Sequence, residues 1–346
     1  MSKKIDIYKN PMKKLDIKNP KKVSVIIPNY NYEKYIIERI DSVLMQTYPI
    51  YELIILDDCS TDNSINVIEE KIKNIKDIKI QFIKNQKNSG GVFKQWKKGF
   101  DAATGDVIWI AEADDSAENN FVEELIKPFD DPEVLLSYCE SARIDGENNL
   151  IREKSDDLYD MCRTGEWNKS YIWSGKEENI YHLAVTNTIL NVSSVMWRKK
   201  DYTEIFAKAG EFKVAGDWYI YYNLLKNGKI SWNAKPLNYY RKHGSSVCTD
   251  VRADIEFGEI CRIQDEISSI YEIPAEIKKK HQMRRELRDP LLPKKKIAWV
   301  IPHPGKGSGG HRTIIQNVNA LIKAGYECDI FVEEDGVSTS ENVRNK

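Results

Sequence analysis

The sequence predicts an α/β protein in which a mostly parallel sheet carries helices on both faces. Two observations lead to this prediction. Short runs of β-branched and other apolar residues alternate with segments of helical periodicity between residues 22 and 111, and this alternation is typical of βαβ units. Polar residues also gather where each apolar run ends. With 346 residues, 41% of them hydrophobic, the chain is long enough for one large domain and part of another.

Each element of the first half follows from local signals. Apolar runs that stop at turn residues predict buried strands at 22–28, 51–56, 78–83 and 106–111. Apolar residues three and four apart predict helices at 35–46, 64–75 and 93–103. Ser60 or Asp62 is a suitable cap for the second of these helices.

The second half of the chain is less regular. The expected elements are strands at 134–142 and 193–198, a helix at 217–226, a segment 236–240 leading into Arg241, and helices at 253–271 and 275–287. A further βαβ unit is expected from a strand at 296–301, a glycine loop at 305–310, a helix at 313–324 and a strand at 326–332. One such unit cannot close a parallel sheet alone, so we predict that the sequence is cut from a longer protein.

These elements suggest four segments: a lysine-rich leader 1–22, a main domain 23–250, a helical connector 251–293 and the truncated start of a second α/β domain at 294–346. The leader carries eight lysines and two aspartates. That composition predicts a solvated segment, with weak attraction to an anionic membrane surface as the alternative. No apolar run reaches the ~18–20 residues of a membrane span. We therefore expect a cytoplasmic protein, either free or peripheral at the inner face of the membrane.

The overall charge bears on the class of partner. Basic and acidic residues nearly cancel, leaving a net charge of −1. A general nucleic-acid binder normally carries a basic excess or stripe, so we expect no nucleic-acid partner.

Polar side chains follow three of the predicted strands at the point where each strand ends. They lie at residues 29–31, 57–58 and 112–115. Ligands of open α/β sheets bind beyond the carboxyl ends of the strands. We therefore expect these three segments to meet in one crevice.

The segment Glu112–Asp115 places three carboxylates within four residues. Their mutual repulsion costs stability unless a cation offsets it. Oxygen ligands suit Mg²⁺ or Mn²⁺, which commonly bind one or two carboxylates plus substrate phosphates. The cluster therefore predicts a divalent metal site completed by a diphosphate, and a bare turn is the alternative. Taken singly, Asp58 and Asp62 are equally well explained as turn and cap residues.

Three motifs carry a family resemblance. Val23–Asn31, Ile54–Ser64 and Ala111–Asp115 resemble the inverting family-2 glycosyltransferases of the GT-A fold. The similarity is dense over residues 23–120 and thinner to about residue 250. It implies a Rossmann-like GT-A domain that transfers a sugar from a nucleotide-diphosphate donor of the UDP or dTDP type. The implied acceptor is a glycan or lipid-linked glycan of surface polysaccharide synthesis, and the implied cofactor is Mn²⁺ or Mg²⁺.

The resemblance also implies roles for the residues that follow the first strands. Pro28 and Tyr30 match residues that frame the nucleotide base. Asp57 and Asp58 match the pair that holds the base and the ribose. Glu112 stands where the family more often has Asp, and it would face the ribose.

Further along the chain, the resemblance implies the catalytic groups. Asp114 matches the metal-binding Asp of the DxD motif, with Asp115 beside it as a second ligand. Asp217 matches the catalytic base, although an N-cap is the alternative interpretation for an Asp that opens a helix. Arg241 and His243 match a late motif that reaches the diphosphate and the metal.

Two departures from the family pattern weaken the resemblance. Gly216 replaces the usual Glu before the base, and residues 93–99 lack the usual Ala-Arg-Asn run. A non-catalytic module that binds nucleotide-sugar or glycan therefore stays open. A sugar nucleotidyltransferase is a second alternative, although the first strand is not followed by the glycine-rich signature that it needs. Near the end of the chain, residues 307–312 resemble the opening of a GT-B glycosyltransferase.

Overall fold

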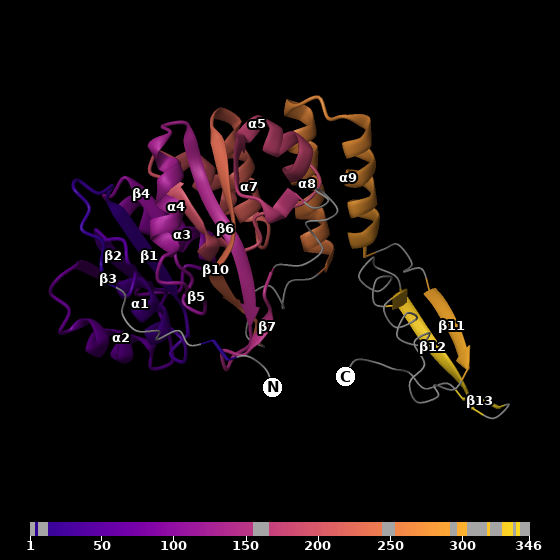
Figure 1. Cartoon of the computed structure of the whole chain (residues 1–346), viewed down its shortest axis with the longest axis horizontal. Coiled ribbons are helices and arrows are strands. Elements are labelled where there is room, and N and C mark those ends of the chain that lie inside the picture. Colours follow the sequence, from indigo (N-terminus) through magenta and orange to yellow (C-terminus); the bar gives the residue numbers. More distant parts are fainter. Residues whose placement is uncertain are drawn as a thin grey trace. The chain divides into compact units, whose positions relative to one another are not determined.

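A computed structural model describes residues 4–5, 13–154, 166–243, 253–290, 296–302, 317–318, 327–334 and 337–339. It divides the chain into two compact units, Met1–His281 and Gln282–Lys346 (Figure 1). All of the predicted site residues belong to the first unit.

A ten-stranded mixed sheet forms the centre of the first unit. Its main strands run in the order β3-β2-β1-β4-β9-β6-β10-β5, with β7 beside β6 and β8 beside β10. Strands β3, β2, β1 and β4 are mutually parallel, as are β6 and β10, whereas β9 runs antiparallel between β4 and β6. The strands are β1 (Val23–Asn29), β2 (Glu52–Asp57), β3 (Lys79–Lys84), β4 (Val107–Ile110), β5 (Ser116–Ala117), β6 (Val134–Ile144), β7 (Leu150–Arg152), β8 (Tyr171–Ser174), β9 (Val195–Arg198) and β10 (Lys229–Arg241).

Helices cover both faces of this sheet. The α-helices are α1 (Ile36–Leu44), α2 (Ser64–Ile72), α3 (Val92–Ala102), α4 (Phe121–Ile126), α5 (Gly175–Glu178), α6 (Thr203–Ala209), α7 (Gly216–Leu224), α8 (Ala253–Ile270) and α9 (Ala275–Arg288). Short helices are η1 (Lys127–Asp130), η3 (Glu166–Asn168), the π-helix η4 (Asn179–Leu183), η5 (Val192–Ser194) and η6 (Leu225–Asn227).

The pleat of β1 divides the core between the two faces. Ile26 belongs to a core that also contains residues of α3, α6, α7 and α8, whereas Val25 and Ile27 belong to the core of α1, α2 and α4 on the other face. Alternate residues of a strand point to opposite faces, so one strand serves both cores. Gly99 of α3 lets this helix approach the sheet closely, because a Cβ there would lie 2.4 Å from Cγ2 of Ile26. The predicted α/β fold with helices on both faces is confirmed.

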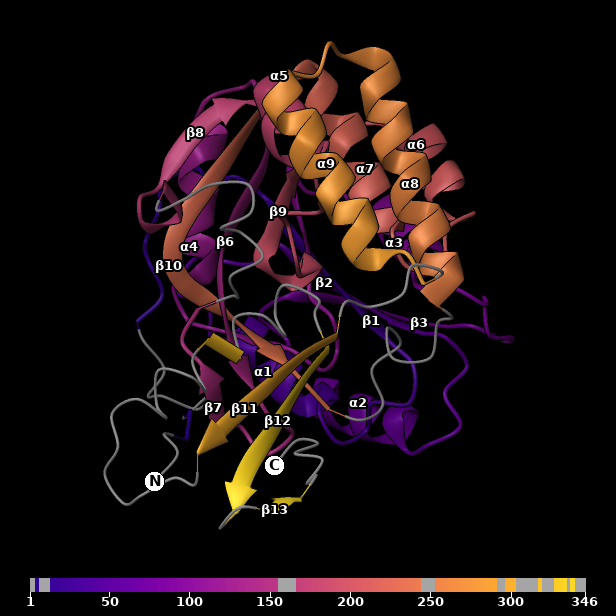
Figure 2. The same cartoon turned by 90° about the vertical axis from the view of Figure 1, so that its right-hand side faces the viewer.

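The helix α8 belongs to the main domain. Ile260, Ile263 and Ile267 are buried in the core that contains α7, as is Ile277 at the start of α9, and α8 lies beside α7 in Figure 2. The sequence assigned residues 251–293 to a connector, but the structure divides its two units after His281. The many charged residues of these helices suggested a connector, whereas their buried isoleucines pack against the core.

The second unit contains a three-stranded sheet in the order β11-β12-β13. Strands β11 (Lys296–Pro302) and β12 (Glu327–Glu334) are parallel, as the βαβ pattern predicts, and β13 (Val337–Thr339) adds an antiparallel strand. The predicted glycine loop at 305–310 and the residues 307–312 that resemble a GT-B enzyme lie outside the described residues. Of the predicted helix 313–324, only residues 317–318 are described, and they are helical.

Candidate active site

The ends of β1, β2 and β4 bring the predicted segments together. Asn29 pairs with Asp57 in the parallel register of β1 and β2, and Ile26 pairs with Ile110 at the end of β4. The chain then turns sharply after β2, because Cys59 adopts a left-handed conformation with φ 65°. Non-glycine residues rarely adopt such angles, and those that do cluster at functional sites. Residues 29–31, 57–58 and 112–115 therefore follow neighbouring strands at one edge of the sheet.

The first of the two predicted base-binding residues, Pro28, is buried in β1, whereas Tyr30 is 45% exposed just beyond it. Asp57 is fully buried. Its carboxylate accepts hydrogen bonds from Nδ2 of Asn29 (2.8 Å) and from the backbone N and Oγ of Ser60 (2.8 and 2.6 Å). Asp57 therefore holds the loops after β1 and β2 together, and Tyr30 presents its ring outside them.

Asp58 is held in a similar way from a more distant loop. Its carboxylate accepts hydrogen bonds from Asn85 (2.6 Å), Gln95 (2.9 Å) and both the backbone N and Oγ of Ser89 (2.8 and 2.7 Å). These donors come from the segment between β3 and α3 and from α3 itself. Asp58 therefore fixes this loop beside the ends of the strands.

The two neighbouring aspartates after β4 have different surroundings. Asp115 is 2% exposed. It accepts hydrogen bonds from Asn191 (2.9 Å), from Oγ of Ser193 (2.7 Å) and from the backbone N of Arg241 (2.9 Å). Burial and the adjacent charge of Asp114 raise the pKa of Asp115 to about 6. Its carboxylate thus joins β4, the segment before β9 and the end of β10.

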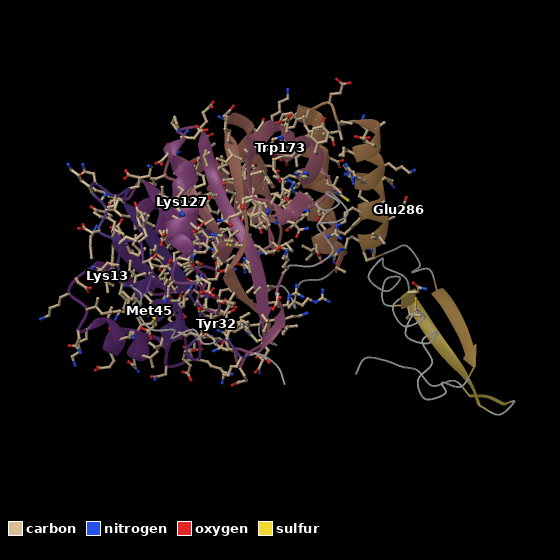
Figure 3. The ribbon with its side chains drawn as sticks, in the orientation of Figure 1. Lys13, Tyr32, Met45, Lys127, Trp173 and Glu286 are labelled. Atoms are coloured by element: carbon tan, nitrogen blue, oxygen red, sulfur yellow. The ribbon has the colours of Figure 1, made fainter. Side chains whose placement is uncertain are left out.

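Asp114 keeps a partly open carboxylate, with its side chain 15% exposed. Oδ2 of Asp114 lies 2.9 Å from Nε2 of His243. The imidazole lies against the rings of Tyr32 and Tyr35, with ring centroids 5.7 and 5.2 Å away. Burial and the charge of Asp114 raise the pKa of Tyr32, which lies between β1 and α1 (labelled in Figure 3). Asp114 is thus only partly buried and contacts the side chains of His243 and Tyr32, whereas Asp115 is buried.

A buried cation faces this carboxylate cluster from α1. Arg39 is 0% exposed, its guanidinium lies 4.9 Å from the ring centroid of Trp109, and its Nε and Nη2 atoms lack a hydrogen-bond partner in the described residues. Burial lowers its pKa to about 10, against the opposing effect of Asp115 and Asp114. Arg39 therefore supplies part of the countercharge that the sequence assigned to a metal alone. A lone Arg in an amphipathic helix gave no signal of this role.

Arg241 is almost fully buried at the end of β10. Its Nε donates to the backbone O of Asp114 (2.6 Å), its Nη1 donates to the backbone O of Asp145 (3.1 Å) and to Asn148, and its Nη2 pairs with Glu38. The guanidinium therefore connects four segments of the protein. The predicted contact with a diphosphate gains no support from these partners.

Glu112 is held by an aromatic residue of α3. Nε1 of Trp96 donates to Oε1 of Glu112 over 2.7 Å. Burial and the charges of Asp114 and Asp115 raise the pKa of Glu112 to about 8, although the Trp96 hydrogen bond opposes this rise. We call Glu112, Asp114, Asp115 and Arg39 together the acidic end of the site.

Asp217 lies in the first turn of α7. Its Oδ2 accepts a hydrogen bond from Asn187 (3.0 Å), and its Oδ1 accepts one from the backbone N of Trp218 (2.7 Å). Burial raises the pKa of Asp217 to about 7, and the charge of Glu259 adds to this effect. A group with a pKa near neutrality is suited to accept a proton at neutral pH. We call Asp217, Asn187 and Gly216 the base end.

Gly216 has a structural explanation. A Cβ at this position would lie 2.6 Å from Cε2 of Phe93 and 2.8 Å from the backbone O of Ala209. Phe93 in turn packs edge-on against Trp96, with ring centroids 5.0 Å apart. The two departures from the family pattern, at 216 and at 93–99, are therefore one packing arrangement. The aromatic pair of α3 reaches from the base end to Glu112.

The segment between η4 and β9 connects the two ends. Asn187 binds Asp217, Asn191 binds Asp115, and Oγ of Ser193 accepts a hydrogen bond from the backbone N of Glu112 over 3.1 Å. Sequence reasoning missed this segment, because its contacts span 30 to 81 residues and its spacing carries no motif. The only sequence signal was a run of polar residues just before a predicted strand.

Tyr221, one turn after Asp217, interacts with charges from both ends. This residue is fully buried. Burial and the negative charges of both Asp217 and Glu112 raise its pKa well above the usual value. The two carboxylates therefore lie within electrostatic range of one hydroxyl group.

The side chains at Asp114 include oxygen ligands for the predicted divalent metal. The carboxylate oxygen of Asp114 is a ligand type that Mn²⁺ and Mg²⁺ accept, and the imidazole nitrogen of His243 lies 2.9 Å from it. Among the described residues, no three Cys, His, Asp or Glu side chains form a ready metal centre. Mg²⁺ and Mn²⁺ sites that are completed by substrate phosphates need only one or two protein carboxylates, so the residues present fit the ion.

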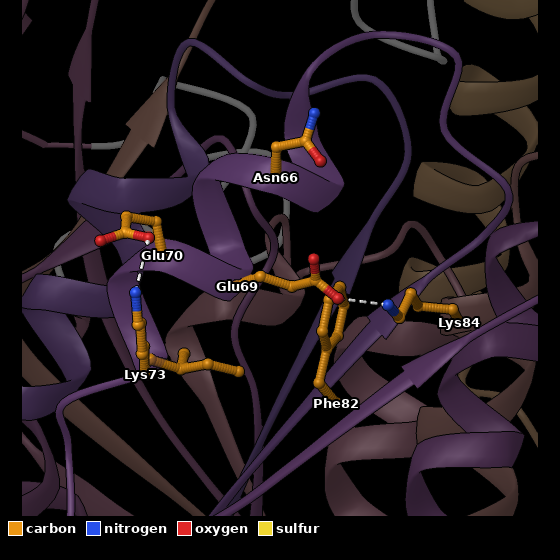
Figure 4. A pocket seen from close by; sticks show the side chains of 7 residues that line it. Asn66, Glu69, Glu70, Lys73, Phe82 and Lys84 are labelled. Carbon is orange, nitrogen blue, oxygen red and sulfur yellow. Dashed lines mark hydrogen bonds and ion pairs between the residues drawn. The ribbon is translucent and has the colours of Figure 1, made fainter.

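A surface pocket elsewhere contains none of these groups. It lies between α2 and β3 and is lined by Asn66, Glu69, Glu70, Ile72, Lys73, Phe82 and Lys84 (Figure 4). Ion pairs join Lys84 to Glu69 and Lys73 to Glu70. Because these charges are already paired across an open surface, the pocket plays no part in the site.

Carboxylates beyond the ends of parallel strands are typical of α/β proteins that bind ligands at this edge. Residues 24–203 match the domain named Glycosyl transferase family 2, which is more than half of the 346 residues. The chain therefore belongs to glycosyl transferase family 2, as the sequence motifs indicated.

Two bacterial relatives carry glycosyltransferase names. A protein of Nostoc sp., named an uncharacterized glycosyltransferase, is 32% identical over 234 residues, which are 65% of this chain and 66% of that protein. Glycosyltransferase GlyG of Streptococcus pneumoniae is 32% identical over 127 residues, which are 36% of this chain and 41% of GlyG. The chain thus spans less than two thirds of the length of these relatives.

Solved structures share the fold. The crystal structure of S. aureus TarS 1–349 in complex with UDP-GlcNAc has a TM-score of 0.55 at 19% identity, over 77% of this chain and 70% of that one. Mannosyltransferase PcManGT from Pyrobaculum calidifontis, in complex with GDP-Man and Mn²⁺, has a TM-score of 0.54 at 16% identity, over 80% and 72%. The predicted GT-A-like fold is confirmed. In the part of the chain that the structure describes, every helix is too short or too polar to cross a bilayer.

Proposed function

We propose that the main domain transfers a sugar, with inversion, from a nucleoside-diphosphate donor to a saccharide or lipid-linked saccharide hydroxyl in surface polysaccharide synthesis. The observation that carries this proposal is the contrast between the surroundings of two carboxylates, Asp114 and Asp217. Asp114 is partly open beside His243, whereas Asp217 has a pKa near 7 and only neutral hydrogen-bond donors. Family membership supports the reaction class.

The names of similar proteins support the donor and the ion. TarS has been crystallised with UDP-GlcNAc and PcManGT with GDP-Man and Mn²⁺, and a hyaluronan synthase of Streptococcus pyogenes is 33% identical over 144 residues. We therefore propose Asp114 and His243 as ligands of Mn²⁺ or Mg²⁺, which would offset negative charge on the departing diphosphate. Asp115, which the sequence assigned to the metal, is proposed instead to position Asp114.

The reaction follows from the two ends of the site. The carboxylate of Asp217 accepts the proton of the acceptor hydroxyl, whose oxygen forms a bond to the anomeric carbon of the donor. The bond from that carbon to the diphosphate oxygen breaks, and the nucleoside diphosphate leaves with the electron pair. The ring of Tyr30, exposed beyond β1, stacks on the nucleotide base in this proposal. Attack from the side opposite the leaving group inverts the anomeric centre.

The test is release of nucleoside diphosphate from UDP-, dTDP- and GDP-sugars, each with a pool of glycan acceptors, in the presence of Mn²⁺, Mg²⁺ or EDTA. We expect release that needs both an acceptor and a divalent cation, and that the Asp114→Asn variant lacks. A protein that binds a nucleotide sugar, measured by calorimetry, but never releases the diphosphate would instead be a binding module.

A further inference from the structure

The residue Glu259, on a helix that the sequence assigned to a connector, contacts the base end. Its carboxylate accepts three hydrogen bonds from consecutive backbone N–H groups, those of Lys213 (2.6 Å), Val214 (2.9 Å) and Ala215 (2.9 Å). These residues immediately precede α7, whose second residue is Asp217. Three charge-assisted hydrogen bonds to one carboxylate fix a backbone segment more firmly than neutral bonds would.

The helix α8 is itself anchored to the core. Ile260 and Ile263, which follow Glu259 on this helix, are buried at 6% and 0% exposure. Arg262 pairs with Glu211 (3.2 Å) and lies 4.5 Å from the ring centroid of Phe212. The segment before α7 is therefore held by a rigid element rather than by a mobile loop.

The backbone N–H groups of residues 213–215 have no hydrogen-bond acceptor other than Glu259 in the described hydrogen bonds. The cap residue of α7 makes no side-chain cap bond. Helix N-termini carry unsatisfied N–H groups that acidic side chains commonly satisfy. In this protein the acid comes from a separate helix 44 residues away from Ala215.

We propose that Glu259 is a positioning residue for sugar transfer, because it fixes the segment before α7 and so the side chain of Asp217. This inference rests on the proposed function of Asp217 as base. It makes α8 a part of the catalytic domain, so a protein ending near residue 250 would lack a component of its site.

Glu259 also contributes charge. Burial is the main cause of the raised pKa of Asp217, the hydrogen bonds from Trp218 and Asn187 oppose it, and Glu259 is the charged group among the causes. Tyr221 on the same helix interacts with the charge of Asp217 as well. Removing the charge of Glu259 should therefore lower the pKa of Asp217.

The test compares Glu259→Gln with Glu266→Gln. Both substitutions remove one carboxylate from α8. Glu266 accepts hydrogen bonds from the Tyr222 hydroxyl and from Nε of Arg262, but it is not among the groups that shift the pKa of Asp217. We expect Glu259→Gln to reduce kcat about 10- to 100-fold with little change in KM, since small misplacements of a catalytic group carry such losses. Its pH–kcat profile should shift to lower pH. Glu266→Gln should keep the wild-type kcat and profile. Equal effects of the two variants, or a wild-type profile for Glu259→Gln, would overturn the proposal.

Two further measurements keep this result separate from the proposed function. The pKa of the Asp217 carboxyl can be followed by isotope-edited infrared spectroscopy, with Asp217→Asn as the blank and without any substrate. A lower pKa in Glu259→Gln supports the inference even if no donor is found, and an unchanged pKa contradicts it. If Glu259→Gln fails to fold, Glu259→Asp can be used instead. It keeps the negative charge but moves the carboxylate away from the backbone N–H groups. It should lower kcat without shifting the pH–kcat profile. A wild-type kcat in that variant would likewise contradict the inference.

Discussion

The acidic end and the base end hold their carboxylates by different means. At the acidic end, charged neighbours and many donors surround the carboxylates, and Asp115 alone accepts three hydrogen bonds. At the base end, Asp217 has two neutral donors and a carboxylate, Glu259, as its charged neighbour. The partners of a carboxylate, rather than its place in a motif, therefore decide whether it is available for chemistry.

The base end should give the largest effect on activity. Asp217→Asn removes the proton acceptor while keeping the size of the side chain, and a general base contributes typically 10²–10⁴-fold. We expect kcat to fall by about 10³-fold under saturating donor and acceptor. The measurement is transfer under single-turnover conditions, with circular dichroism to verify folding. A folded variant with more than a tenth of wild-type activity would remove Asp217 from the mechanism.

The same variant should gain stability at high pH. The folded pKa of Asp217 is raised to about 7 from an ordinary value of 3.8, so the folded protein binds a proton that the unfolded chain has lost between these values. Stability therefore falls as pH rises through this window. Asp217→Asn should melt about 2–4 °C above wild type at pH 8 and close to it at pH 4.

At the acidic end, substitutions of the adjacent residues Asp114 and Asp115 should have different effects. Asp114→Asn should reduce transfer about 10²-fold or more and raise the divalent-ion concentration needed, while the melting temperature stays close to wild type. Asp115→Asn should destabilise the fold by roughly 1–3 kcal/mol, because the donors around it lose their acceptor. Urea unfolding and metal titration of both variants make the comparison. Equal losses of stability in the two variants would contradict the assignment of a structural role to Asp115 and not to Asp114.

Gly216 tests the packing that links the two ends. Gly216→Ala should destabilise the protein by roughly 1–3 kcal/mol, since its Cβ would meet both Phe93 and the rigid backbone O of Ala209. Gly258→Ala is the matched control, because a Cβ at this α8 position meets nothing within 4 Å. That control should be neutral or stabilising by roughly 0.5–1 kcal/mol. Comparable unfolding curves for the two variants would show that the space at Gly216 is not restricted.

The parts of the fold that the sequence predicted depend on local patterns. Strands β1 to β4 begin and end close to their predicted bounds, and the helices between them begin close to theirs, since each apolar run is bounded by its own turn residues. Strands β5, β7 and β8 were missed because they are two to four residues long. The predicted segment 236–240 is the end of a thirteen-residue strand, β10, whose irregular register obscures its period.

The sequence motifs predicted the candidate site residues but not the residues that hydrogen-bond to them. The roles of Asp114 and Asp217 were predicted from the resemblance of short motifs to a family and stay predictions. Their partners come from far along the chain, as His243 lies 129 residues from Asp114 and Asn187 lies 30 residues from Asp217. No local pattern records which donors will surround a carboxylate after folding. The buried Arg39 and the positioning Glu259 belong to this class of residue.

The pH dependence of kcat tests the central claim most directly, because it reports the protonation of the group that accepts the acceptor's proton. With a raised pKa of about 7 for Asp217, the rate should be half maximal near pH 7, rise to a plateau above it, and fall about tenfold for each pH unit below. The measurement uses saturating donor, acceptor and divalent ion. A rate that stays constant from pH 5 to 8, with the same donor and a folded protein, would contradict the assignment of Asp217 as the catalytic base.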